Sequence, residues 1–209
     1  MTGSRNYFET VAPKWDNLRQ GFFSETVREK AFEAAGAVAG KIAADIGAGS
    51  GFVTEGLLRR GLRVIAVDRS EAMLEEMRRK FGEGGAVDYR IGEAEALPLE
   101  DRSVDYVFAN MCLHHVDTPP AAIREMARIL KHGGRLVTTD LDRHDFEFLR
   151  TEHCDRWMGF DRPDVARWFA EAGLVEVKID CIGENCCAAS QSGCGQAAVS
   201  IFVASGMKS

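Results

Sequence analysis

The sequence contains no apolar stretch that approaches the roughly 18–20 residues needed for a membrane-spanning helix. Its first residues, MTGSRNYFETV, include no apolar leader. Acidic side chains outnumber basic ones and give a net charge of −6, so no broad basic field faces a nucleic-acid backbone. Internal repeats and low-complexity segments are also missing. We therefore expect a soluble, cytoplasmic protein whose partners include neither membrane nor nucleic acid.

Cysteine pairs of the C-x2-C type, which structural zinc sites prefer, are missing as well. The chain has six cysteines, and four of them lie close together near its end: Cys181, Cys186, Cys187 and Cys194. Without a leader they should be mostly reduced. Zinc is the minority interpretation of this cluster, and we assign no metal ligands. Small cysteines packing a β-hairpin, or soft thiolates that bind a thiophilic atom, are the alternatives.

The length and composition fit one domain with a substantial core, since the chain has 209 residues and is 45% hydrophobic. Short β-rich runs alternate with amphipathic segments, a pattern typical of an α/β protein. Strands are predicted at 41–45, 62–68, 87–91, 104–109, 135–140, 174–182 and 197–204. Helices are predicted at 22–39, 52–60, 71–81, 119–130 and 162–172. The last two strands should pair at one edge of a seven-stranded, mostly parallel, doubly wound sheet.

The stretch KIAADIGAGSG dominates the sequence, because a short apolar run ends on Asp45 and is followed by Gly47, Gly49 and Gly51. It predicts a strand, a tight turn and a helix. Glycines allow a ligand to approach the backbone closely, and the first N–H groups of the next helix offer free donors.

A dinucleotide is one ligand for such a turn, but its G-x-G-x-x-G fingerprint needs a third glycine where this chain has Phe52. A carboxylate at Asp45 would also repel a diphosphate, whereas it suits a ligand with an ammonium group. A dehydrogenase is therefore the weaker alternative. Asp68 closes the next predicted strand, about 20 residues on, where an acid can hold the two hydroxyls of a ribose.

These residues resemble motif I and the following acid of the class I S-adenosylmethionine-dependent methyltransferases. Three further segments are similar to that family: Gly92–Pro98 (GEAEALP), Asn110–Val116 (NMCLHHV) and Lys131–Gly134 (KHGG). Glu93 replaces the commoner aspartate of the first segment, and His132 replaces a proline of the last. The resemblance covers about residues 5–205 and implies one methyltransferase domain over 1–209, with S-adenosylmethionine as cofactor.

The resemblance also implies a set of cofactor contacts. Asp45 and the three glycines would hold the methionine part, Asp68 with Arg69 the ribose, and Glu93 with Ala94 the adenine. Asn110 and Met111 would lie beside the cofactor at a strand end. Residues 1–40 resemble the helical lead-in of ubiquinone and menaquinone methyltransferases, in which an aromatic arm covers the cofactor. Tyr7 and Trp15 would form that lid, or simply pack on the domain.

The acceptor side is less constrained by the sequence. A histidine, His114 or His115, could take a proton from a hydroxyl or thiol, or the pair could be structural. The segment 141–160 should be a substrate-side insertion, and within it Asp155-Arg156-Trp157-x-Gly159-Phe160 resembles a signature of methyltransferases associated with metalloregulators. We expect the acceptor between the two histidines, Trp157 and a loop bearing Cys186 and Cys187.

The preferred interpretation is methyl transfer to a small molecule, with a thiol or thiophilic metalloid as the first acceptor hypothesis and Cys186 and Cys187 as its catalytic residues. Carbon or oxygen methylation of an aromatic or quinone-like metabolite is the main alternative. A non-catalytic sensor that binds S-adenosylmethionine or metal is a third. The protein would act as a monomer or homodimer.

Overall fold

The fold is known from a computed structural model that describes residues 3–190 and 195–209. One mixed sheet runs through it in the strand order β3-β2-β1-β4-β5-β7-β6. The strands are β1 (Ile42–Ile46), β2 (Arg63–Asp68), β3 (Val87–Ile91), β4 (Val104–Asn110), β5 (Leu130–Leu141), β6 (Leu174–Ala189) and β7 (Gln196–Lys208). The first five pair in parallel, and β7 runs antiparallel to both β5 and β6. The predicted α/β fold class is therefore confirmed.

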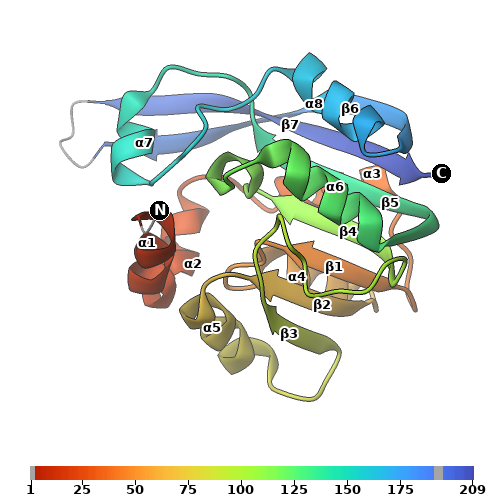
Figure 1. Cartoon of the computed structure of the whole chain (residues 1–209). Coiled ribbons are helices and arrows are strands. Elements are labelled where there is room, and N and C mark those ends of the chain that lie inside the picture. Colours follow the sequence, from red (N-terminus) through yellow and green to blue (C-terminus); the bar gives the residue numbers. More distant parts are fainter. Residues whose placement is uncertain (1–2, 191–194) are drawn as a thin grey trace.

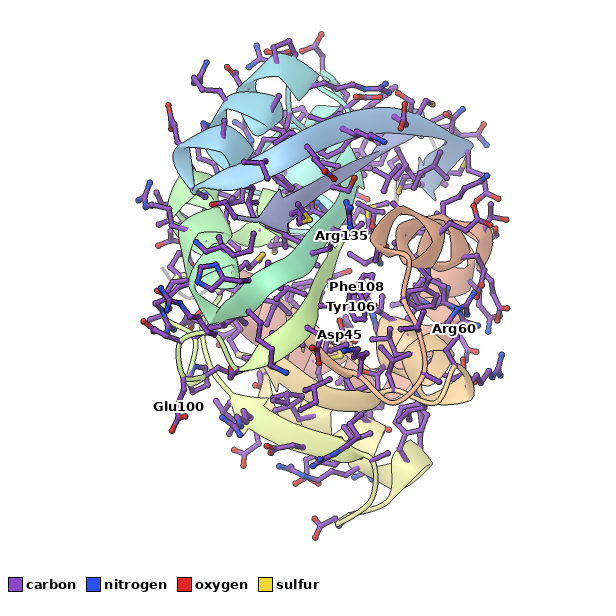
Figure 2. All side chains as sticks on the ribbon, turned by 90° about the vertical axis from the view of Figure 1, so that its right-hand side faces the viewer. Asp45, Arg60, Glu100, Tyr106, Phe108 and Arg135 are labelled. Atoms are coloured by element: carbon purple, nitrogen blue, oxygen red, sulfur yellow. The ribbon has the colours of Figure 1, made fainter. Side chains whose placement is uncertain are left out.

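Central strands of this sheet are covered on both faces, which explains why they are almost continuously apolar. Asp45 of β1 lies beside Phe108 of β4 in the register, and both are at most 1% exposed. Figure 2 labels both residues in the middle of the sheet. A carboxylate therefore lies in the interior of the molecule, close to the end of the strand that carries it.

Helices cover the two faces in sequence order. The helices α3 (Thr26–Ala35), α4 (Phe52–Arg59) and α5 (Glu71–Phe81) pack on one face, and α6 (Pro119–Ile129) and α8 (Arg162–Glu171) pack on the other. Ser70 caps α5, because its hydroxyl accepts a hydrogen bond from the backbone N–H of Met73. None of the helices in the described ranges is long and apolar enough to cross a membrane.

The remaining helical segments gather at the edge of the sheet where the parallel strands end (Figure 1). They are α1 (Gly3–Val11), η1 (Ala12–Lys14), α2 (Trp15–Gln20), η2 (Leu113–His115) and α7 (Glu147–Glu152). Ligands bind at this edge in doubly wound folds. The N-terminal segments and α7 thus stand over the region where a site is expected.

Two predicted elements differ from the observed ones. The helix expected at 22–39 is α3, which begins only at Thr26 because the Ser24 hydroxyl accepts the backbone N–H of Thr26, and ends where Gly36 takes a left-handed φ of 60°. The expected loop with the cysteines is part of β6, which pairs with β7 as far as Ala189. Register shifts between Cys181 and Asn185 interrupt this long ribbon and give the sequence its loop-like appearance.

Candidate functional site

The glycine turn after β1 is shaped by contacts that leave no room for side chains. Gly47 has a φ of 66°, and a Cβ there would lie 2.5 Å from the Cys112 sulfur. Gly51 has a φ of 97°, and its Cβ would lie 2.6 Å from the Phe81 ring. The turn therefore needs glycine for both backbone conformation and space, and the lack of side chains allows a ligand to approach its backbone closely.

Asp45 is fixed under this turn, where its Oδ2 accepts hydrogen bonds from the backbone N–H and the hydroxyl of Thr54 at 2.9 and 2.7 Å. Burial raises the pKa of Asp45 to about 7, although the bonds from Thr54 act in the opposite direction. The carboxylate is thus destabilised in the free protein. A cation next to it would stabilise the ionised form.

Asp68 ends β2 and faces the same turn. Its two oxygens accept the backbone N–H groups of Gly49 and Ser70, each at 2.8 Å. Burial raises the pKa of Asp68, and these two bonds lower it again. Arg69, the next residue, lies 3.9 Å from the Glu93 carboxylate. The strand ends thus bring together acids that the sequence separates.

A cavity enclosing about 880 Å³, partly open to solvent, connects these groups. We call it the donor cavity. Of the residues predicted to bind the cofactor, it is lined by Asp45, Gly47, Gly49, Asp68, Arg69, Glu93, Ala94, Asn110, Met111 and Trp15. Gly51 shapes the turn without lining the cavity, and Tyr7 lies elsewhere. The cavity is also lined by four residues that were not predicted, Phe8, Arg19, Phe23 and Phe52. In the sequence, apolar residues of this kind look like core residues, and a lone arginine looks like a surface residue.

A second cavity of about 530 Å³ adjoins the first, and we call it the acceptor cavity. The two share a wall formed by Phe8, Trp15, Phe23, Met111 and His115. Met111 has a positive φ of 50°, which is costly for a residue with a side chain and directs it to this junction. The rest of the acceptor cavity is lined by Tyr7, Phe22, His114, Leu141, Leu149, His153, Asp155, Cys186 and Ala188.

The polar end of the acceptor cavity is built on His114. Its Nδ1 donates to the Asp140 carboxylate at 2.6 Å, and its Nε2 lies 3.8 Å from an Asp155 oxygen. Asp140 is itself held by the backbone N–H groups of Leu113 and Leu141. Burial alone would lower the pKa of His114, but the charges of Asp140 and Asp155 raise it to about 9.

His115 has the opposite electrostatic character. Burial and the neighbouring charge of His114 hold the pKa of His115 well below its ordinary value, so its imidazole is neutral. Its Nδ1 lies 3.4 Å from the Cys154 carbonyl. Because a carbonyl only accepts, Nδ1 carries the proton and Nε2 keeps a lone pair. The two adjacent histidines therefore differ in charge.

The predicted cysteine pair does not form. Cys186 lines the acceptor cavity, but Cys187 lies on the other side of the strand and is exposed, as side chains alternate along β6. Burial raises the pKa of Cys186 to about 12, so it is a neutral thiol and a poor soft ligand. Cys181 is exposed, and Cys194 lies outside the described residues. The positions of Cys186 and Cys187 therefore do not support the expected two-thiolate acceptor site.

Trp157 also departs from its predicted place. Its side chain lines neither cavity and is 40% exposed, while its indole N–H donates to the Val116 carbonyl at 3.0 Å. Phe160 lies in the core. Within this segment it is Asp155 that reaches the cavity, because the backbone N–H groups of Arg156 and Trp157 bond to the His114 carbonyl.

Comparison with known proteins decides what kind of protein carries these cavities. Residues 44–138 match a family model described as a methyltransferase domain. A ubiquinone biosynthesis O-methyltransferase from Hahella chejuensis is 30% identical over 188 residues, which cover 80% of this chain and 78% of the relative. The chain belongs to the class I S-adenosylmethionine-dependent methyltransferases. The predicted family and its cofactor, S-adenosylmethionine, are therefore confirmed.

Two other similarities bear on this methyltransferase. A demethylmenaquinone methyltransferase from Renibacterium salmoninarum is 34% identical over 154 residues, covering 72% of this chain but only 64% of the relative. A methyltransferase structure from Thermotoga maritima, described as a possible histamine N-methyltransferase, aligns over 100% of both chains with a TM-score of 0.71 at 22% identity. The second similarity concerns the fold alone.

Proposed function

We propose that this methyltransferase moves a methyl group from S-adenosylmethionine in the donor cavity to a hydroxylated aromatic or quinol-like small molecule in the acceptor cavity. The shared wall of Phe8, Trp15, Phe23, Met111 and His115 is the observation that supports this most directly. Two adjoining cavities allow a donor and a nucleophile to be aligned in one line, which is the main requirement when the methyl group is already activated.

On the donor side, the assignments follow the chemistry of each group. Asp45 and the glycine turn bind the ammonium and carboxylate of the methionine part, Asp68 and Arg69 the ribose, and Glu93 with Ala94 the adenine. Asn110 and Met111 flank the sulfonium. Trp15 closes the cavity above Gly49, since a Cβ placed on Gly49 would lie 3.6 Å from the indole nitrogen of Trp15. Tyr7 is reassigned to the acceptor side because it lines that cavity.

On the acceptor side, an apolar wall and a polar end point to a ring with a hydroxyl group. Phe22, Leu141, Leu149 and Ala188 suit the flat apolar part. The histidines and Asp155 suit the hydroxyl. In the reaction the hydroxyl loses its proton to solvent and its oxygen attacks the methyl carbon. The carbon–sulfur bond breaks as the carbon–oxygen bond forms, and its electron pair stays on sulfur, giving S-adenosylhomocysteine and a methyl ether.

Other evidence supports the choice of acceptor class. Two of the relatives have names that refer to quinone biosynthesis. The insertion at 141–160 and the lead-in at 1–40 supply most of the acceptor cavity, in keeping with a substrate-side and a lid role. A thiol or metalloid acceptor loses its basis, because Cys186 and Cys187 do not face the same cavity.

Release of S-adenosylhomocysteine, measured with phenols, quinols, thiols and arsenite as acceptors, tests this function. We expect turnover with phenols or quinols, and mass spectrometry of the product separates oxygen from carbon methylation. Turnover with thiols or arsenite alone would overturn the proposal. Donor binding without turnover on any acceptor would instead support the sensor hypothesis.

A matched pair of variants links turnover to the acceptor cavity. Ala188→Leu fills that cavity, whereas Ala198→Leu adds the same atoms to an exposed position on the partner strand. We expect Ala188→Leu to abolish turnover while the affinity for S-adenosylhomocysteine is kept, and Ala198→Leu to change neither. Equal turnover in both variants would show that the acceptor binds elsewhere.

A further inference from the structure

Side chains with metal-binding atoms meet at the polar end of the acceptor cavity. One nitrogen each of His114 and His115 and one oxygen of Asp155 lie within 4.8 Å of one another. His114 and Asp155 are buried, and His115 is partly buried. Two imidazoles and one carboxylate are a donor set that suits divalent transition metals rather than Mg²⁺ or Ca²⁺.

The second ring nitrogen of each histidine is already engaged in the way metal sites require. His114 Nδ1 donates to Asp140 at 2.6 Å, and His115 Nδ1 donates to the Cys154 carbonyl at 3.4 Å. Histidines that bind a metal typically donate their other N–H to a carboxylate or carbonyl, which fixes ring orientation and tautomer. The Nδ1 atom of each ring is thereby occupied, so Nε2 is the atom that each histidine would offer to a metal ion, in the form that carries no proton there.

The spacing leaves room for an ion. The 3.8 Å between His114 Nε2 and Asp155 is too long for a hydrogen bond. Ligand atoms about 2.1 Å from a tetrahedral metal are roughly 3.4 Å apart. Because the three atoms now lie within 4.8 Å of one another, the longest separation needs to shorten by at most about 1.4 Å.

Backbone contacts hold the three ligands in place. The N–H groups of Arg156 and Trp157 bond to the His114 carbonyl at 2.9 and 3.1 Å, which ties η2 to the segment that carries Asp155. Cys154 adopts a left-handed φ of 61°, a strained conformation, just where its carbonyl meets His115. His153 lines the same cavity, and its buried Nε2 has no hydrogen-bond partner among the described residues.

We propose that His114, His115 and Asp155 bind a divalent transition-metal ion at the polar end of the acceptor cavity. Three protein ligands leave a coordination position open, as catalytic metal sites do. The site deepens the proposed function and its role rests on it: an acceptor hydroxyl bound to the ion loses its proton to solvent more readily, which makes its oxygen a better nucleophile.

A Co²⁺ titration of the full chain, treated beforehand with EDTA and passed over a desalting column, tests the site without donor or acceptor. We expect one equivalent to bind, with the visible absorption of a low-coordinate Co²⁺ centre. Asp155→Asn and His115→Gln should each weaken binding by more than the 10–100-fold typical of losing an outer-shell partner. His132→Gln, at an exposed histidine remote from the cavity, and Cys186→Ser should bind like the unmodified chain.

Circular dichroism of each variant separates lost ligands from lost folding. Absence of Co²⁺ binding by the unmodified chain, or unchanged binding by both folded ligand variants, would overturn the site. Methyl transfer at an unchanged rate after EDTA treatment would overturn its role while leaving the proposed function intact. Metal binding without turnover on any acceptor would support the site and count against the function.

Discussion

The donor and acceptor cavities share a wall but are built in different ways. The donor cavity is made largely by turns that directly follow β1, β2, β3 and β4, and much of it is backbone. The acceptor cavity is made by side chains from segments as distant in sequence as Tyr7, Asp155 and Ala188. The first is therefore fixed by local sequence and the sheet, and the second by tertiary packing.

This difference explains which residues of each cavity are able to change without disturbing the fold. Any replacement at the glycine turn disturbs backbone conformation and neighbouring core residues together, whereas a side chain such as Cys186 is exchangeable without moving a strand. One scaffold is thereby able to keep a donor and change acceptors. The variants below test whether the two cavities separate in this manner.

Gly51→Ala should have the largest effect. At a φ of 97° its new methyl group would lie 2.6 Å from Phe81, so we expect a loss of about 2–4 kcal/mol in the free energy of unfolding, from backbone strain and overpacking. Gly36→Ala is the control, since its φ of 60° is also positive but nothing lies within 4 Å; it should cost about 1–2 kcal/mol. Thermal unfolding measures both, and equal losses would show that space at Gly51 is unimportant.

Asp45→Asn should come next, with a loss in affinity for S-adenosylhomocysteine of about 10-fold or more, corresponding to at least 1.4 kcal/mol. The pKa of Asp45 is about 7 in the free protein, so the carboxylate becomes ionised as the pH rises toward 7 and affinity should rise with it. At higher pH, where the ligand's own ammonium loses its proton, affinity should fall again. Calorimetry across pH 5.5–9 checks this, and a rising limb that persists in Asp45→Asn would contradict it.

The same difference decides what the sequence was able to predict. The glycine turn, Asp68 and the strand ends follow from local patterns, and the predicted bounds of α5 (Glu71–Phe81) match the observed ones. Asp155 was named only as part of a signature and not as a site residue, because its place beside His114 depends on backbone bonds between distant segments. Cys186 and Cys187 were expected on one loop, whereas they lie on a strand, where neighbouring side chains point to opposite faces.

Asp16→Asn should have a moderate effect on both cavities. Asp16 in α2 accepts a hydrogen bond from the Ser50 hydroxyl at 2.6 Å and pairs with Lys80, so it ties the lead-in to the glycine turn. Because the pair is partly exposed, we expect at most about 1 kcal/mol, or about a fivefold faster release of S-adenosylhomocysteine. Stopped-flow fluorescence measures this rate. Asp101→Asn, which breaks an ion pair with Arg128 away from both cavities, should leave it unchanged.

Cys186→Ala and Cys187→Ala should have the smallest effects and separate the two faces of β6. Removing the Cys186 sulfur takes away one apolar atom from the acceptor cavity, so the acceptor KM should rise by up to about fourfold, the equivalent of about 0.8 kcal/mol. Cys187→Ala should leave kcat and KM unchanged because its thiol is exposed on the opposite face. Affinity for S-adenosylhomocysteine should be constant in both. Complete loss of turnover in either variant would mean that its thiol takes part in the chemistry. The acceptor cavity would then use a cysteine as a reactive group, whereas its geometry gives the Cys186 sulfur a packing role only.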